Sequence, residues 1–152
     1  MRKLTYGLVV LVLLVSGCQS KTKSTTVCTI AQDEMKVTLT LDAEGDTITK
    51  LTQQATTDLQ TSFDQGLLNE DSVKQSADAV KEKLSKLKGA SYKYTLKKTT
   101  LDETSVFDLT KADIDELIDA KILEIEGSTE KGLSLKKSVA NYKEQGLTCK
   151  TK

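Results

Sequence analysis

The chain has 152 residues with 22 basic and 22 acidic side chains, and it contains no histidine, tryptophan or proline. The balanced charge argues against a nucleic-acid partner, because such partners select a strongly basic surface. The absence of histidine removes the side chain that most often acts as a general base near neutral pH.

Residues 1–17 are typical of a secretory leader. Arg2 and Lys3 give a positive start, and an apolar run follows over residues 4–15. A helix of that length spans about 18 Å, well short of the roughly 30 Å hydrocarbon core of a membrane. The sequence VSGC, which ends at Cys18, resembles the lipobox of bacterial lipoproteins. It predicts removal of the leader and acylation of Cys18, whereas an ordinary leader with a chance cysteine is the alternative.

The mature chain is expected to begin with a tether. Residues 19–26 (QSKTKSTT) contain no apolar side chain, so we expect residues 18–26 to comprise the lipidated Cys18 and a flexible linker. Two acyl chains, such as palmitate, are what stable membrane anchoring requires. We therefore expect an extracytoplasmic protein that is anchored to the outer face of the cell membrane, with residues 27–152 as a single domain. The lysine-rich mature chain, which has no arginine, indicates a Gram-positive bacterium.

Two cysteines, Cys28 and Cys149, lie at opposite ends of this domain. An exported protein works in an oxidising compartment, so an even pair predicts a disulfide bond. The bond would close a ring of about 120 residues, for which the chain-entropy relation gives up to about 5 kcal/mol of stabilisation. A zinc site is the alternative, but zinc needs more ligands, and the domain has no histidine and no third thiol. We expect a structural bond and no metal.

The first half of the domain shows the patterns of a hairpin and a helix. Residues 35–41 alternate apolar and polar, residues 42–46 predict a turn, and residues 47–57 predict the return strand. Ile48 and Leu51 would fall on opposite faces of that strand, so a bulge or a two-sided strand must be allowed.

The helix that follows has a stripe of apolar residues at steps of three and four, with capping residues at both ends. The stripe is Val73, Ala77, Val80, Leu84 and Leu87. Asn69 or Asp71 can cap the start, and Gly89 can end the helix in a left-handed turn.

The second half predicts another hairpin and two more helices. Strands are expected at residues 92–96 and 107–109, with a turn near residues 101–102. A short helix carries Ile114, Leu117 and Ile118, and a last helix runs from Ser134 to Gly146. The order strand-strand-helix-strand-strand-helix-helix predicts an α+β fold, with an antiparallel sheet of about four strands and helices mainly on one face.

Few residues are candidates for chemistry. Ser134 to Lys137 and Ser85 to Lys88 both match S-x-x-K, in which a desolvated lysine can activate a serine. The S-D-N and K-T-G partner motifs of such enzymes are missing, and the chain is so rich in lysine that chance matches are expected.

Carboxylates and tyrosines are the remaining candidates for a functional site. An acidic stretch comprises Asp108, Asp113, Asp115, Glu116, Asp119, Glu124 and Glu126. It favours a solvated, helix-stabilising surface over a weak calcium patch or a partner surface, because the spacing fits no calcium loop. Tyr92 and Tyr94 are more consistent with the core or rim of a sheet than with a ligand platform.

Several short segments together resemble the YehR-like family of small bacterial lipoproteins. They are the lipobox cysteine, Val27-Cys28, Glu44-Gly45-Asp46 with Thr49-Lys50, the segment from Leu133 to Val139 (LSLKKSV), and the tail from Gln145 to Lys150 (QGLTCK). The resemblance implies a lipid-anchored α+β domain without an agreed biochemical activity, so no catalytic residues can be carried over. We therefore expect no enzyme and no cofactor, but a module that binds a protein, a peptide or a small apolar ligand. A small cell-envelope hydrolase that uses carboxylates or a Ser–Lys pair is the alternative.

Overall fold

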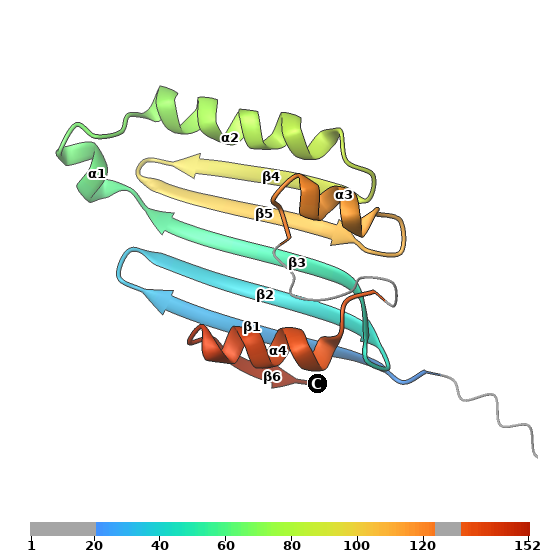
Figure 1. Ribbon diagram of the computed structural model, residues 1–152. Helices are drawn as coiled ribbons and strands as arrows, with labels where there is room; N and C mark the ends of the chain where they lie inside the picture. Colours follow the sequence, from blue (N-terminus) through green and yellow to red (C-terminus); the bar gives the residue numbers. More distant parts are fainter. Residues whose placement is uncertain (1–20, 124–131) are drawn as a thin grey trace, which may run out of the picture.

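The computed structural model describes residues 21–123 and 132–152, which form a six-stranded antiparallel sheet with helices on one face (Figure 1). The strands are β1 (Lys23–Gln32), β2 (Met35–Glu44), β3 (Thr47–Asp58), β4 (Ala90–Lys97), β5 (Thr100–Asp108) and β6 (Thr148–Thr151). The helices are α1 (Gln60–Asp64), α2 (Glu70–Ser85), α3 (Ile114–Asp119) and α4 (Leu135–Glu144). The predicted leader, Cys18, Glu124 and Glu126 lie outside the described residues. None of the described helices combines the length and the apolarity that crossing a membrane requires.

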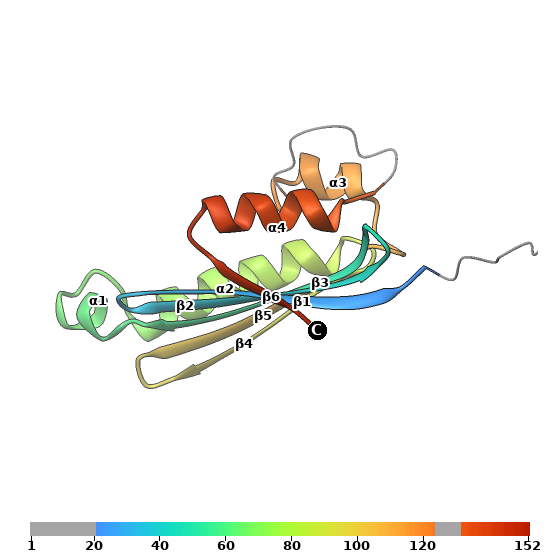
Figure 2. The same ribbon diagram turned by 90° about the horizontal axis from the view of Figure 1, so that it is seen from below.

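The strand order β4-β5-β3-β2-β1-β6 gives the sheet two recognisable ends. The start of β1, the turn between β2 and β3, and α3 lie at one end, which we call the near end (Figure 1). The turn between β1 and β2, helix α1, and the turn between β4 and β5 lie at the opposite end, the far end. Figure 2 shows α2, α3 and α4 on the same side of the sheet.

The predicted α+β fold is confirmed, but the expected four strands are six. β1 and β6 were not predicted, because their threonines and lysines give little contrast in hydropathy between the two faces. Residues 23–26, expected within the tether, belong to β1, where the register pairs Thr26 with both Leu41 and Thr151. The Thr26 side chain is completely buried, and its hydroxyl shares a 2.8 Å hydrogen bond with that of Thr151. The prediction of a flexible tether through Thr26 is therefore wrong for these four residues.

Two local predictions also need correction. The expected turn near residues 101–102 lies instead at residues 98–99, and Leu101 is a β5 residue paired with Thr57. Lys98 adopts a φ of 55°, a left-handed conformation that lysine does not signal in a sequence. Helix α1 was not predicted, since five residues are too few to show a helical period.

A β-bulge decides the orientation of β3. The register shifts between Asp42 and Ala43, so Thr49 is the extra residue on the β3 side. Ile48 and Leu51 consequently point to the same face, and both are buried. Of the two arrangements that the sequence allowed, the structure contains the bulge.

The hydrophobic core lies between the helices and the helix-facing side of the sheet. Its buried members come from β2, β3, β4, β5, α2, α3 and the segment before α4: Leu41, Ile48, Leu51, Ala77, Leu84, Tyr92, Phe107, Leu117 and Leu133. Helix α2 begins at the predicted cap Asn69, which accepts a 2.8 Å hydrogen bond from the Ser72 backbone N–H. Val80, predicted to be buried in the α2 stripe, is 41% exposed.

In the structure, a disulfide bond joins Cys28 and Cys149, which lie directly opposite each other on the paired strands β1 and β6. The two residues are 121 positions apart, so the bond joins the beginning and the end of the domain. Cys28 is completely buried and pairs with Leu39, two residues from the core residue Leu41, so the bond lies on the helix-facing side of the sheet. The short strand β6 is thus held to β1 by a covalent bond as well as by backbone pairing.

Replacement of Leu84 by alanine should lower the free energy of unfolding by about 2–5 kcal/mol, because it leaves a cavity in the core. Urea denaturation of the mature chain provides the measurement. Val80→Ala in the same helix is the matched control and should cost less than about 1 kcal/mol, since that side chain is already largely in water. Equal losses for the two variants would mean that the buried face of α2 is misassigned.

Reduction of the disulfide should destabilise the domain by up to about 5 kcal/mol through loss of the chain-entropy restraint. Thiol titration of the unfolded, unreduced mature chain should detect neither Cys28 nor Cys149. After reduction, both thiols should react and the urea midpoint should fall. Two reactive thiols before reduction would rule the bond out.

Candidate functional site

Ser134, the first S-x-x-K serine, is the N-cap of α4. Its hydroxyl donates to Asp46 Oδ2 at 2.7 Å and accepts the backbone N–H of Lys137 at 3.2 Å. Asp46 Oδ1 in turn accepts the backbone N–H of Lys136 at 2.8 Å. These bonds, chiefly the one from the Lys136 backbone and then that from Ser134, lower the pKa of Asp46. The arrangement fixes the start of α4 to the β2–β3 turn, which is a structural use of the serine.

Ser85, the second S-x-x-K serine, lies at the C-terminal end of α2. Its hydroxyl donates to the Glu82 carbonyl oxygen at 2.7 Å, and both Ser85 and Lys88 are exposed. A catalytic lysine of this kind needs a desolvated site that lowers its affinity for a proton. In the part of the chain that the structure describes, neither Ser–Lys match combines the two side chains in an enclosed cleft.

Within the described residues, two members of the acidic stretch stabilise local structure. Asp108 pairs with Lys111 at 2.7 Å, and the hydrogen bond from Lys111 lowers the pKa of Asp108 to about 2. Asp113 caps α3 by accepting the backbone N–H groups of Asp115 at 3.0 Å and Glu116 at 3.2 Å. Across residues 21–123 and 132–152, no group of three or more acidic or cysteine side chains is placed to hold a metal ion.

The tyrosines lie on the helix-facing side of β4. Tyr92 is buried in the core and its hydroxyl donates to Glu103, so that burial, followed by this carboxylate, raises the pKa of the phenol. Tyr94 is half-buried and donates to Asp78 of α2 at 3.0 Å. Both phenols therefore connect β4 to neighbouring elements, in agreement with the predicted core and rim positions.

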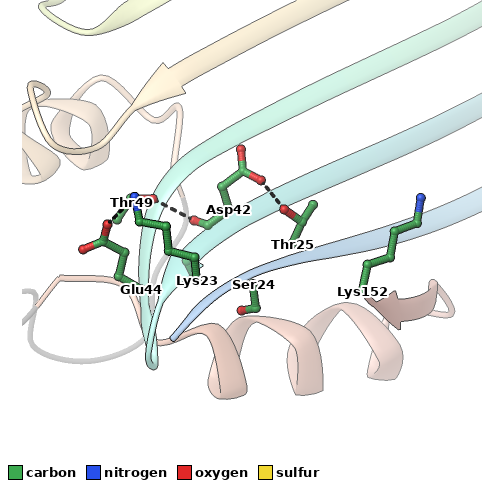
Figure 3. Close-up of a pocket in the computed structure, with 8 residues that line it drawn as sticks. Lys23, Ser24, Thr25, Asp42, Glu44, Thr49 and Lys152 are labelled. Atoms are coloured by element: carbon green, nitrogen blue, oxygen red, sulfur yellow. Dashed lines mark hydrogen bonds and ion pairs between the residues drawn. The ribbon is translucent and has the colours of Figure 1, made fainter. Parts of the chain in front are cut away.

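An open hollow of about 540 Å³ lies at the near end, where β1 begins (Figure 3). Both of its carboxylates are ion-paired: Glu44 pairs with Lys23 at 3.5 Å, and Asp42, which also accepts the Thr25 hydroxyl at 2.7 Å, pairs with Lys50 at 3.9 Å. Figure 3 shows the Lys152 side chain at its margin, apart from these pairs. The hollow is lined by exposed or half-buried polar residues and the buried Ala43, and none of the lining residues has a large apolar side chain. This composition gives little basis for binding a small apolar ligand.

Exposed hydrophobic residues also belong to segments at the other end of the sheet. Among the described residues, four large hydrophobic side chains are exposed, and three of them, Met35, Leu67 and Leu68, belong to far-end segments (Figure 1). Their exposed fractions are 43%, 70% and 38%. We call these three residues the far-end surface. Clustered exposed apolar side chains mark interaction sites more often than singly scattered ones.

The backbone that carries the far-end surface is held by hydrogen bonds. The backbone N–H groups of Leu67 and Leu68 both donate to the Ser62 carbonyl oxygen, at 3.0 and 3.3 Å. Glu34, beside Met35, accepts bonds from the Asp58 backbone N–H at 2.7 Å and the Thr61 hydroxyl at 2.5 Å. These contacts tie α1 to the turn between β1 and β2. The leucines are thus exposed on an ordered segment.

The far-end surface was not among the predicted site residues. The signal was available in the sequence, because Leu67 and Leu68 stand between Gly66 and the α2 cap Asn69, outside the apolar stripe of the helix. An apolar pair in a loop has no helix or strand face to bury it. Its exposure depends on how far α1 and the sheet extend, which only the tertiary structure shows.

Comparison with known proteins identifies the family of this chain. A family model described as "Protein of unknown function (DUF1307)" matches residues 24–148. The NMR structure of Escherichia coli YehR is similar, with a TM-score of 0.69 and 15% identity over 85% of this chain and 91% of that one. The NMR structure of a protein from Streptococcus pneumoniae TIGR4 matches with a TM-score of 0.52 and 19% identity over 99% and 98% of the chains. No curated protein matches significantly. At these identities, the solved structures bear on the fold alone.

Replacement of Asp46 by alanine should destabilise the domain by about 1 kcal/mol at pH 7, because it removes acceptors at the start of α4. The pKa of Asp46 is lowered in the folded protein, so its contribution is present above the unfolded pKa and is lost as the pH falls through the folded value. The difference in unfolding free energy between the native chain and the variant should therefore shrink below about pH 4.

The matched control is Glu144→Ala, which removes an exposed carboxylate from the same helix. Urea denaturation at a series of pH values measures all three proteins. A difference for Asp46→Ala that stays constant down to pH values below the folded pKa would contradict the assigned role.

Proposed function

This chain belongs to the DUF1307 family of YehR-like proteins, and we propose that it is a lipid-anchored extracytoplasmic module that binds a partner and catalyses no reaction. The observation that carries the proposal is the position of the far-end surface. Three exposed hydrophobic side chains lie at the end of the sheet opposite the start of β1, which is where the chain arrives from Cys18.

The short connection from Cys18 to β1 determines which end of the domain would lie near the membrane. Lys23, the first residue of β1, is five positions after Cys18, and a chain of that length spans at most about 18 Å. The ten residues of β1 then extend for about 33 Å toward the far end. An acyl group on Cys18 would hold the near end close to the membrane, while the far end can point away from it.

The polar contacts support a binding role over the hydrolase alternative. Ser134 and Asp46 are used to start α4, and Ser85 bonds to the backbone of α2. Catalysis by a serine and a lysine depends on a buried lysine beside the serine, whereas the lysines that follow Ser134 and Ser85 in the motifs are exposed. Hydrogen-bonded caps of this kind stabilise helices without needing reactive groups.

The shape of the surface favours a macromolecular partner. The hollow at the near end is open and lined by polar residues of both charges, whereas the exposed hydrophobic side chains at the far end belong to the loop between α1 and α2 and to the first residue of β2. Small ligands are typically held in concave, largely apolar sites, while proteins and peptides also bind to exposed patches. We infer a protein or peptide partner on the outer side of the membrane.

Cys18→Ala tests the anchor. Cells that express the full chain are labelled with radioactive palmitate and separated into membrane and soluble fractions. The native chain should carry label and remain with the membranes, and the variant should lose the label, because the acyl chains are attached to that sulfur. Cys149→Ser is the control, since it removes a cysteine and should leave labelling intact. A variant at Cys18 that still incorporates palmitate would refute the proposal.

A further inference from the structure

Helix α3 covers only part of the sheet between α2 and α4. Leu117 of α3 is 1% exposed and belongs to the core together with Leu41 of β2 and Leu51 of β3. Beyond these two strand residues, toward the far end, Figure 1 shows no described helix in front of β2 and β3. The helix layer is therefore incomplete over the far-end halves of these two strands.

The uncovered halves of β2 and β3 present uncharged residues on the helix-facing side. Steps of two residues from the core members of each strand stay on that side of the sheet. They lead to four residues, which we call the open strip: Met35, Val37, Gln53 and Ala55. Met35 is 43% exposed, Gln53 is also exposed, and the other two are half-buried, although Val37 and Ala55 lie directly opposite each other on neighbouring strands. Apolar side chains on the inner face of the sheet thus remain in contact with water.

Val80 lies on the side of α2 that faces α3. Lys83, three residues later on the same side of the helix, donates to the Ala120 carbonyl oxygen at the end of α3 at 2.8 Å. This side of α2 therefore borders the space that α3 fills only in part. Val80 is 41% exposed although it belongs to the apolar stripe of the helix. A helix layer that stops at α3 accounts for its exposure.

The dimensions of the uncovered part fit one helix. α2 packs against β4 and α4 against β6, and these strands are five strand spacings apart, which amounts to about 24 Å. With neighbouring axes about 10 Å apart, one further helix would take about 20 Å of this width and two would take about 30 Å. The six residues from Leu41 to Met35 span about 20 Å, which is the length of a helix of about 13 residues.

The chemistry of the open strip suits the apolar face of a helix. None of its four residues is charged. Glu103, which lies opposite Ala55 on β5, already accepts the hydroxyl of Tyr92. An apolar stripe placed here would remove hydrophobic surface from water without burying an ionised side chain of the strip.

We propose that the open strip binds one amphipathic helix of the partner protein, about 13 residues long, which lies between α2 and α4 and continues the layer that α3 begins. Its apolar stripe would contact Val37 and Met35 on the sheet and Val80 on α2. Met35 belongs to both the far-end surface and the open strip. This inference rests on the proposed function, because the helix belongs to the partner of the anchored module.

Two other occupants fit the open strip less well. A second copy of this chain offers no such helix among its described residues, because the apolar faces of α2 and α4 are packed on their own sheet. A single lipid acyl chain is much narrower than the distance between α2 and α4 and would leave most of the strip in water. An amphipathic helix matches the width, the length and the lack of charge.

The test uses full-length acylated chain in nanodiscs of zwitterionic lipid and a fluorescent synthetic peptide of about 14 residues. The peptide has leucines at helical spacing and lysine–glutamate pairs elsewhere, so that it carries no net charge. Binding is measured by anisotropy, and empty nanodiscs supply the background. A peptide of the same composition in scrambled order should bind at least about tenfold more weakly, because it cannot form one continuous apolar stripe.

Gln53→Glu and Gln54→Glu form a matched pair of variants, because both residues are exposed and adjacent strand residues point to opposite faces. Gln53→Glu places a charge under the apolar stripe and should weaken binding at least about tenfold. Gln54→Glu changes the face without helices and should bind like the native chain. Both variants should keep the native urea midpoint, since each is an isosteric change in contact with water. Val80→Ser should weaken binding several-fold from the side of α2.

Equal binding of the two peptides, or equal effects of the two glutamate substitutions, would overturn the inference. Binding of fluorescent palmitate that Gln53→Glu abolishes would assign the open strip to a lipid, and self-association that Gln53→Glu abolishes would assign it to a second copy. Either result would also overturn the inference. Failure of the proposed function looks different: a chain that carries no palmitate would refute the anchor, whereas an anchored chain that binds neither peptide would contradict the inference alone.

Discussion

The pairing of β1 with both β2 and β6 is the contact on which the rest of the structure depends. Because β1 runs the full length of β2 and also receives β6, it brings the beginning and the end of the domain together on neighbouring strands. The bond between Cys28 and Cys149 reinforces this junction. The same strand gives the domain its direction, since it starts at the near end and reaches the far end without interruption. A site at the far end is therefore separated from any anchor by the length of the sheet.

The sequence predicts elements well where hydrophobic contrast is strong. The helix α2 with its cap at Asn69 was predicted correctly, except that Val80 of its apolar stripe is exposed, and the start of α4 at Ser134 was also correct. β1 and β6 could not be recognised because the side chain of Thr26 is buried and polar, and its hydrogen-bonding partner, Thr151, lies at the other end of the chain. A hydropathy pattern cannot show a hydroxyl pair that only the completed sheet brings together.

The candidate site was less predictable than the fold. The absence of histidine from the chain, and of arginine beyond Arg2, limits the available chemistry, but it does not identify a surface. Val80 illustrates the difficulty: the helical period indicates which side of α2 faces the sheet, but not how far neighbouring elements cover that side. Leu67 and Leu68 are exposed for a related reason, because hydrogen bonds to Ser62 fix their backbone in the loop between α1 and α2, outside both helices. Whether neighbouring elements bury a side chain depends on how the helices and the sheet pack together. The pattern of a single segment does not show this.

Fluorescence quenching from the bilayer tests most directly whether the far end of the domain points away from the membrane, as proposed. Full-length acylated chain is placed in vesicles that contain a quencher in the lipid, with a fluorophore attached either at Lys21→Cys or at Gln65→Cys. A label at residue 21 should be strongly quenched, and one at residue 65 should fluoresce as it does in solution, because the length of β1, about 33 Å, separates the two ends. Equal quenching at both positions would show that the domain lies flat on the membrane and would contradict an outward-facing far end.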